Sequence, residues 1–549
     1  MNGGRVARSR AVGAGTWWTV GRVAWVVGGC ATLAVLLTLA DPGITVDEPL
    51  DVRPGRTYLA TLRAKGWGFF QPSVIDAVFR DNAEHPPLGR WLLGVASTLG
   101  QPFEVLLRGG PDPVGVYVVA GRVAPAVAFG VLVGLVALVA GRQSGRPAGL
   151  VAGLSLLMMP RVFAHAHLAA LDTFITLFWA VALVGIVGAS RQPRVIPAMV
   201  GAGLLWGLAL LTKIHAWFLP PVAILWLVTQ LPLRRAIPAL MIWLATGLVV
   251  FLLGWPWLWT DPLGRLSGYL GTGVARVSIR VQYFGTVYAD RDVPWHYPWF
   301  YFLATVPVGL LAMAACGTIR GWSDPVLRAT TRLWVGSIAL FLGLFSTNVA
   351  VYDGERLFLV VFPFLAILTG QGFGFLWRDR RRARRAILLT VLVLQAGGVV
   401  WMHPFGLSYY NALVGGLPGA ERLGLELTYW GDAVDDVLLD RLADEARAND
   451  SAALVPTLAP DQGKFATTRR LVRIPLVVGD GDAASAADYL LVARRTAYWS
   501  AAVRDRLARD QWVAVRSRQG VWLSALLTRR KANPPSRTGA DLYNGFRSR

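Results

Sequence analysis

Apolar runs of about 20 residues, each followed by a short polar break, fill the chain from Trp17 to Met402. An α-helix of that length crosses a hydrocarbon layer roughly 30 Å thick. The pattern therefore predicts an α-helical integral membrane protein with about eleven transmembrane helices. The predicted spans are Trp17 to Ala40, Val114 to Ala140, Ala148 to Met159, Leu168 to Gly188, Ala198 to Leu211, Trp217 to Val228, Ile237 to Trp257, Trp299 to Cys316, Leu333 to Val349, Leu357 to Leu376 and Ala386 to Met402.

Alternate breaks between the runs are rich in arginine, which predicts the orientation of the chain. Short loops that carry Arg and Lys face the cytoplasm. The arginine-rich breaks are Arg142 to Arg146, Arg191 to Arg194, Arg234 to Arg235, Arg320 to Arg332 and Arg378 to Arg385. The outer side therefore receives the long loop 41–113, the turn 161–167, the loop 259–298, the turn 352–356 and everything after His403.

The character of the sequence changes after His403, where short apolar strands alternate with charged helical stretches. This alternation predicts a small α/β domain over residues 404–532, and the odd number of spans predicts that it is extracytoplasmic. Residues 533–549 are rich in Pro, Ser, Arg and Gly and are predicted to form a loose tail. The transmembrane domain is then residues 1–403.

The composition agrees with a bilayer protein and changes how the charge is interpreted. Of the 549 residues 54% are hydrophobic, and the formal net charge is +21. Because the arginines lie in the breaks rather than on one amphipathic face, they indicate membrane orientation and not nucleic-acid binding. Cys30 and Cys316 both lie in apolar runs, so no disulfide framework is expected. Abundant Arg, Ala, Gly and Val favour a bacterial protein, and hence the plasma (inner) membrane.

An acidic pair follows directly on the first predicted span. Asp47 and Glu48 lie only a few residues beyond its end. Such a pair near lipid is costly unless it is paired, hydrated or coordinated, so it indicates a functional site. The alternative interpretation is the solvated start of a loop.

Two further outer segments carry polar side chains close to predicted spans. Glu84 and His85 precede two prolines and an amphipathic stretch, a pattern that also fits the plain start of an interfacial helix. His165 and His167 lie in a turn, where such a pair is more often structural than metal-binding. Asp172 lies near the start of the next span and is expected to face the protein interior or an aqueous cavity.

Two cations lie at the outer ends of other spans. Lys213 closes the fifth span and Arg356 opens the tenth. A guanidinium matches phosphate oxygens in a bidentate way, so the two together would bind a lipid phosphate, although Lys213 could equally snorkel to the interface. Acids and cations on one membrane face suit transfer of a group from a phosphate-bearing donor. Neither a Walker A pattern nor a paired CxxC nor an HExxH helix is present.

In this order the motifs resemble the membrane glycosyltransferases of the C-type fold, in particular the protein O-mannosyltransferases and the aminoarabinose lipid A transferases. The resemblance covers the membrane region to His403. It rests on the pair Asp47-Glu48, on Glu84-His85-Pro86-Pro87-Leu88, on His167 with Leu171-Asp172-Thr173, on Leu211-Thr212-Lys213 and on Gly354-Glu355-Arg356.

The resemblance implies a polyprenyl-phosphate sugar as donor, bound from the membrane. It also implies transfer of a hexose or pentose to an acceptor protein, lipid or glycan on the extracytoplasmic side. Asp47 would be the catalytic base, with Glu48 assisting and Asp172 shaping the acidic centre. The residues implied to contact substrate are Glu84, His85, His167, Lys213 and Arg356, of which the last two would meet the donor phosphate.

Two details of the resemblance remain open at this point. Some members use a divalent metal ion, for which Glu84 and Asp172 would be the ligands. The lipid A enzymes place a lysine where this chain has His85, so the role of that residue is open. Residues 404–411 and 427–432 resemble the segment after the last span in bacterial members and have no assigned chemistry, although they could help to form the acceptor groove.

The alternative function is a multi-spanning transporter or flippase of a lipid-linked or small polar substrate, because polar residues in a helical bundle also mark transport pathways. Many transporters show inverted repeats and helices broken at the midplane. This sequence shows no such internal symmetry, and its notable acids gather at one membrane face. The pattern therefore favours the enzyme.

Overall fold

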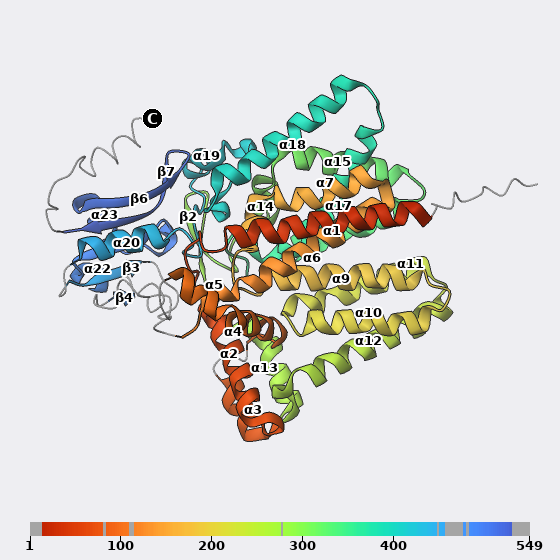
Figure 1. Ribbon diagram of the computed structural model, residues 1–549, viewed down its shortest axis with the longest axis horizontal. Coiled ribbons are helices and arrows are strands. Elements are labelled where there is room, and N and C mark those ends of the chain that lie inside the picture. The colour runs from red at the N-terminus through yellow and green to blue at the C-terminus, as the bar shows by residue number, and fades with distance from the viewer. Residues whose placement is uncertain are drawn as a thin grey trace, which may run out of the picture.

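A bundle of long apolar helices forms the main part of the protein (Figure 1). The computed structural model describes residues 14–80, 84–108, 115–275, 278–446, 450–455, 476–478 and 482–529. Each predicted span overlaps a helix of the bundle, and the span predicted from Trp299 to Cys316 falls on two helices with a bend between them. These helices are α1 (Ala14–Leu37), α6 (Val123–Ser144), α7 (Arg146–Leu157), α9 (Asp172–Ser190), α10 (Val195–Leu210), α11 (Leu219–Gln230), α12 (Leu233–Gly254), α15 (Val308–Ser323), α16 (Arg328–Leu344), α17 (Phe362–Trp377) and α18 (Arg382–Met402).

Not all of these helices are long enough to cross a membrane by themselves. Among the described residues, six helices pass that test of length and apolarity, and a pair bent by 110° would be a seventh. The pair consists of α14 (Tyr297–Thr305) and α15. The mostly helical membrane architecture is therefore confirmed, whereas the number of eleven crossings stays a prediction.

Small residues let the helices of the bundle approach closely, which matters because lipid supplies no hydrophobic force between them. Where α1 crosses α6, a Cβ atom added to Gly28 would lie 2.6 Å from the carbonyl oxygen of Gly130. A side chain at this position would therefore push the two helices apart. The apolar core of the bundle is continuous from α1 to α18.

The segment between α1 and α6 folds into a group of helices at the end of the bundle where α1 ends and α6 begins (Figure 1). Its helices are α2 (Asp47–Lys65), η1 (Gly66–Phe70), α3 (Pro72–Phe79) and α4 (Leu88–Arg108), and α13 (Pro262–Ala275) lies beside them. One side of α4 exposes Leu99, Phe103, Leu106 and Leu107. Such an exposed apolar stripe suits a helix lying along a membrane surface.

Short elements connect the long helices. They are α5 (Val118–Gly121), α8 (Pro160–His165), η3 (Ile214–Phe218), η4 (Pro256–Trp259), η5 (Arg356–Val361) and the antiparallel hairpin of β1 (Arg280–Tyr283) and β2 (Thr286–Ala289). Several of the polar motifs singled out in the sequence lie at the ends of these elements, so the turns between helices supply the site described below.

The C-terminal part contains a five-stranded sheet with the strand order β4-β3-β5-β7-β6. The first three strands pair in parallel, and β7 pairs antiparallel with both β5 and β6. One face packs against α20 (Asp436–Glu445), and the other packs against α22 (Asp482–Ala486) and α23 (Ala501–Arg509). The strands are β3 (Ala452–Val455), β4 (Leu476–Val478), β5 (Tyr489–Ala493), β6 (Gln511–Arg518) and β7 (Val521–Thr528), and η8 (Thr496–Tyr498) follows β5.

This sheet confirms the small α/β region expected at the C-terminus, and it lies at the same end of the bundle as α2 to α4 (Figure 1). The domain boundaries stay predictions, and the expected tail 533–549 lies outside the described residues. The segment between α18 and α20 packs into the core of the helix bundle, where Phe405, Tyr410 and Leu427 are buried. It contains η6 (Gly406–Ser408), η7 (Ala412–Val414) and α19 (Gly416–Arg422).

Candidate functional site

The guanidinium group of Arg356 joins three carboxylates from different parts of the chain. Its Nε atom donates to Asp172 Oδ2 at 3.4 Å, its Nη1 atom donates to Asp353 Oδ2 at 2.9 Å, and its Nη2 atom donates to Asp47. Asp47 begins α2, Asp172 begins α9 and Arg356 begins η5. Three turns between helices therefore meet at one cation, and this group is called the Arg356 cluster.

Lys213 completes the Arg356 cluster from the turn between α10 and η3. Its Nζ atom donates to Asp172 Oδ1 at 2.6 Å, so each oxygen of Asp172 faces a cation. A buried carboxylate needs such pairing because its desolvation is costly. The backbone helps to bring the segments together, since Leu88 N–H donates to the carbonyl oxygen of Leu211 at 2.9 Å. That bond ties the segment that carries His85 to the turn that carries Lys213.

His85 lies close enough to the Arg356 cluster to interact with its charges, whereas Glu84 does not contact it. The Nδ1 atom of His85 is buried and has no hydrogen-bond partner among the described residues. Burial, together with the positive charges of Arg90 and Lys213, holds the pKa of His85 well below its ordinary value. The ring is therefore neutral near pH 7. Glu84 is exposed, and among the described residues it makes no contact with the cluster.

Exposure separates Asp47 from the other carboxylates of the cluster. The side chain of Asp47 is 29% exposed, against 4% for Asp172 and 2% for Asp353. Because Asp172 and Asp353 are buried in ion pairs, Asp47 is the carboxylate of this cluster that is most open to solvent. This difference could not be read from the sequence.

The segment after the last long helix forms one wall of the cluster. The ring centroid of Trp430 lies 3.8 Å from the guanidinium carbon of Arg356, which is a close cation–π contact. The backbone of this segment also pairs with the residues before Asp47. Val46 N–H donates to the Trp430 carbonyl oxygen at 3.2 Å, and Gly43 N–H donates to that of Asp432 at 2.8 Å.

Comparisons with known proteins agree with this architecture. Residues 84–259 match the family described as dolichyl-phosphate-mannose-protein mannosyltransferase. The structure of ArnT from Cupriavidus metallidurans in the apo state is similar over 95% of this chain and 100% of that chain, with 17% identity and a TM-score of 0.52. ArnT bound to undecaprenyl phosphate gives a TM-score of 0.50 at 16% identity and the same coverage. No curated protein matches the sequence. This chain has the C-type fold of membrane glycosyltransferases.

The C-type fold confirms the resemblance drawn from the order of the motifs. The family match covers the segments of His85, Asp172 and Lys213, whereas Asp47 and Arg356 lie outside it. The contacts of Arg356 connect the matched and unmatched parts of the chain. The structure therefore brings Asp47 and Arg356, which the family match does not cover, together with residues that it does cover.

Glu48 points away from the cluster, although it is the direct neighbour of Asp47. Its Oε1 atom accepts from Arg122 Nε at 2.7 Å and from Ala169 N–H at 2.8 Å. Its Oε2 atom accepts from Arg122 Nη2 at 2.9 Å and from Thr45 N–H at 2.8 Å. A fully buried carboxylate with both oxygens in use holds α2 against the turn before α9. This geometry favours a structural role for Glu48 over the assisting role expected from the sequence.

Replacing Arg122 with Met should therefore destabilise the protein strongly, because Glu48 would remain as an unpaired buried charge. Breaking such a pair costs about 3 to 5 kcal/mol. Thermal denaturation of the purified protein in detergent measures the effect, with Arg191→Met, at an exposed position, as the matched control. Equal melting temperatures for the two variants would contradict this assignment.

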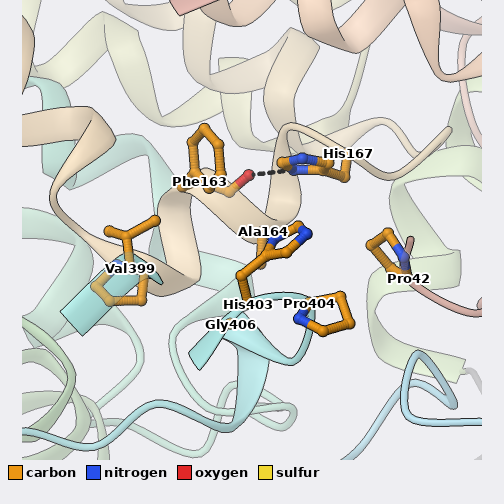
Figure 2. Close-up of a pocket in the computed structure, with 9 residues that line it drawn as sticks. Pro42, Phe163, Ala164, His167, Val399, His403, Pro404 and Gly406 are labelled. Atoms are coloured by element: carbon orange, nitrogen blue, oxygen red, sulfur yellow. Dashed lines mark hydrogen bonds between the residues drawn. The ribbon is translucent and has the colours of Figure 1, made fainter. Parts of the chain in front are cut away.

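His167, expected to contact substrate, lies in a different environment. One ring nitrogen is 2.8 Å from Thr38 Oγ1 and the other is 2.8 Å from the Phe163 carbonyl oxygen. It lines a small pocket with His403 and a set of mostly apolar residues (Figure 2). Burial lowers the pKa of His167 to about 3, so the ring is neutral. Its substrate contact stays a prediction, and the geometry favours a packing role.

The two expected metal ligands do not fit a metal site. Among the described residues no group of three or more His, Cys, Asp and Glu side chains is arranged to hold a metal ion. Asp172 has both oxygens bound to cationic side chains, and Glu84 is exposed. The donor atoms that a divalent ion would need are therefore not gathered at these positions.

Sequence reasoning missed Asp353 and gave Trp430 no role. Asp353 stands in the same motif as Arg356, and its φ of 57° together with that of 64° at Gly354 marks a tight turn. An Asp-Gly pair just before a span is a signal that could have drawn attention to it. Trp430 carries no comparable local signal, because its contact with Arg356 joins residues far apart in the sequence.

Two buried acids of the segment around Trp430 make stability depend on pH. Burial raises the pKa of Glu426 to about 8, against the opposing charge of Arg495, and raises the pKa of Asp432 to about 7. The folded state therefore holds protons that the unfolded state releases at lower pH. Their contribution to stability is greatest below the ordinary pKa values of the two groups. It falls as the pH rises above those values, and it is lost once the pH has passed the raised pKa values, about 7 for Asp432 and about 8 for Glu426.

The melting temperature of the protein should consequently fall between about pH 5 and about pH 8.5. In the double variant Glu426→Gln with Asp432→Asn, the fall should be clearly smaller, because neutral amides cannot lose these protons. Thermal denaturation at a series of pH values measures both slopes. If the double variant keeps the slope of the wild type, these two acids are not its cause.

Proposed function

We propose that the protein transfers a sugar from a polyprenyl-phosphate donor to an acceptor hydroxyl group on the extracytoplasmic side of a bacterial plasma membrane. One observation carries this proposal above all others. Asp47, a partly exposed carboxylate, contacts the guanidinium group that also binds Asp172, and Lys213 binds Asp172 from its other side. A base and two cations thus meet in one place, as transfer from a phosphate ester requires.

Lys213 and Arg356 are the groups that receive the donor phosphate in this proposal. Arginine pairs with phosphate oxygens through two parallel hydrogen bonds, and lysine adds a compact positive charge. Both side chains are nearly buried, at 7% and 9% exposure, so their charges act in surroundings that water screens weakly. The undecaprenyl phosphate bound to the similar ArnT structure supports this class of donor.

The contact between Asp47 and Arg356 suggests how donor binding prepares the base. Without donor, Arg356 holds Asp47 in an ion pair, so its N–H group occupies the carboxylate oxygen that would take the proton of the acceptor. A donor phosphate that binds Arg356 competes with Asp47 for the same N–H groups. Asp47 is then free to accept a proton, so the base becomes active only when the donor is present.

The transfer step follows from these positions. The acceptor oxygen forms a bond to the anomeric carbon of the sugar while its proton passes to the Asp47 carboxylate. The bond between the anomeric carbon and the phosphate oxygen breaks, and polyprenyl phosphate leaves with the electron pair. Lys213 and Arg356 stabilise the charge that develops on this leaving group. His85, neutral and beside them, is placed to donate or accept one hydrogen bond to the sugar or phosphate.

A transfer assay in lipid tests the proposal. The purified protein in lipid vesicles receives radiolabelled polyprenyl-phosphate hexose or pentose together with candidate protein, lipid and glycan acceptors. We expect the label to move to one class of acceptor and polyprenyl phosphate to appear in equal amount. If the intact labelled donor instead crosses the membrane with no release of polyprenyl phosphate, the protein is a transporter and the proposal is wrong.

A further inference from the structure

Arg495 reaches from the C-terminal α/β region to the Arg356 cluster. It follows β5 and is buried, with 3% of its side chain exposed. Its Nη2 atom donates to Asp353 Oδ1 at 2.8 Å, and its Nη1 atom donates to the backbone carbonyl oxygen of Tyr429. Its Nε atom lies 3.4 Å from Glu426. Arg495 thus connects two segments that are distant from it in sequence, the turn that carries Asp353 and the segment that carries Glu426 and Tyr429.

The first connection leads to Arg356 through Asp353. One oxygen of Asp353 accepts from Arg495 and the other accepts from Arg356, so the carboxylate bridges two guanidinium groups. Asp353 adopts a positive φ of 57° in a tight turn, and this backbone conformation fixes the position of its Cβ atom. A carboxylate held at both oxygens and at its backbone has little freedom, and it fixes one edge of the Arg356 guanidinium plane.

The second connection leads to Arg356 through Trp430. Arg495 binds the carbonyl oxygen of Tyr429, the residue before Trp430, whose ring lies against the guanidinium face. The carbonyl oxygen of Trp430 in turn accepts from Val46 N–H, next to Asp47. One side chain of the C-terminal region therefore holds both the edge and the face of Arg356, and through the same segment it holds the backbone before Asp47.

We propose that Arg495 is a positioning residue that orients Arg356 toward the donor phosphate, so that the C-terminal region is part of the donor site. This inference rests on the proposed function. Arg495 is buried behind Asp353 and Tyr429 and does not itself contact substrate. Its effect on catalysis passes through the orientation of Arg356, for which geometry matters because bidentate pairing with phosphate needs the guanidinium plane in one direction.

The test compares Arg495→Lys with Arg494→Ala in the full-length protein. Lysine keeps the positive charge beside Asp353 but cannot make the two divergent hydrogen bonds of Arg495. Arg494 is the matched control, because it binds Glu421 and lies over Trp522, away from the cluster. We expect the KM for donor to rise about tenfold or more in Arg495→Lys, with the KM for acceptor unchanged.

A merely structural role for Arg495 would lower the amount of active protein and leave the KM for donor as it is. That outcome, or a KM equal to that of Arg494→Ala, would overturn the inference. Asp353→Asn provides a second measurement that does not depend on the folding of an Arg495 variant. It removes the charge of the bridge with little change of shape, and the KM for donor should rise in the same way; an unchanged KM overturns the inference as well.

The double variant Arg495→Lys with Asp353→Asn shows whether Arg495 and Asp353 act on Arg356 through the same contact. If Arg495 works through Asp353, the effects of Arg495→Lys and Asp353→Asn on the KM for donor are not additive, whereas independent effects would multiply. Multiplying effects would overturn the route through Asp353. Wild-type protein that transfers no sugar and binds no polyprenyl phosphate would contradict the proposed function itself. Normal wild-type transfer with unaffected Arg495→Lys would contradict only this inference.

Discussion

Asp47→Asn should lower the rate of sugar transfer by about 10²- to 10⁴-fold, the usual contribution of a general base. Asparagine has nearly the same shape but cannot take the proton of the acceptor hydroxyl group. The fold should persist, because Asp47 is partly exposed and Arg356 keeps its contacts with Asp172 and Asp353. The affinity for polyprenyl phosphate should stay equal or rise, since one competitor for Arg356 loses its charge.

The initial rate at saturating donor and the binding of polyprenyl phosphate measure these two effects separately. Asp76→Asn is the matched control: Asp76 is an acid of the same segment between α1 and α6 that pairs with Arg265 at 2.6 Å, outside the cluster. It should transfer sugar at a rate close to that of the wild type. Unchanged turnover in Asp47→Asn would remove Asp47 from the mechanism.

Arg356→Ala should lower the affinity for polyprenyl phosphate by about 10²-fold, because a phosphate in a poorly hydrated site loses its bidentate partner. Lys213→Ala should act in the same direction. Both changes also leave Asp172 with one cation fewer, so each variant should melt at a lower temperature than the wild type. Of these two effects, the loss of affinity for polyprenyl phosphate has the larger influence on sugar transfer.

Binding of polyprenyl phosphate to each purified variant, measured below its melting temperature, separates the two consequences. Arg265→Ala removes an arginine of α13 that binds Asp76 and the Trp257 carbonyl oxygen, and this variant should keep its donor affinity. An unaltered affinity in both Arg356→Ala and Lys213→Ala would discredit the assignment of the phosphate site.

The sequence predicts much of the membrane architecture because lipid imposes simple constraints. Every predicted span overlaps a helix, since a backbone in hydrocarbon must satisfy its hydrogen bonds internally. Asp172, Lys213 and Arg356 could be singled out for a related reason. A charge at the end of an apolar run is unusual enough to indicate function even when its partner is unknown.

The partners of these charges could not be predicted, because pairing depends on how distant turns are folded together. Asp47 and Glu48 are equivalent as a sequence pair, yet one faces the cluster and the other is bound to Arg122, 74 residues further along the chain. Nothing local distinguishes them. Arg495 is similar, since it is one of two adjacent arginines and only the fold directs it to Asp353.

The packing of the segment after His403 against the helix bundle could not be predicted from the sequence either. Its sequence is polar enough to be assigned to a separate soluble region, and its α/β part does form a sheet with its own small cores. Residues before α20 nevertheless pack into the helix bundle and place Trp430 on Arg356. Packing between two such regions depends on matching surfaces, and periodicity in a single sequence does not reveal them.

A structure of the protein with polyprenyl phosphate bound would show directly whether Arg356 and Lys213 hold the donor. We expect the phosphate to lie within hydrogen-bonding distance of Arg356 and Lys213, with Asp47 released from Arg356 and open to an acceptor. A phosphate bound elsewhere, for example in the pocket between His167 and His403, with the Arg356 cluster unchanged, would contradict it.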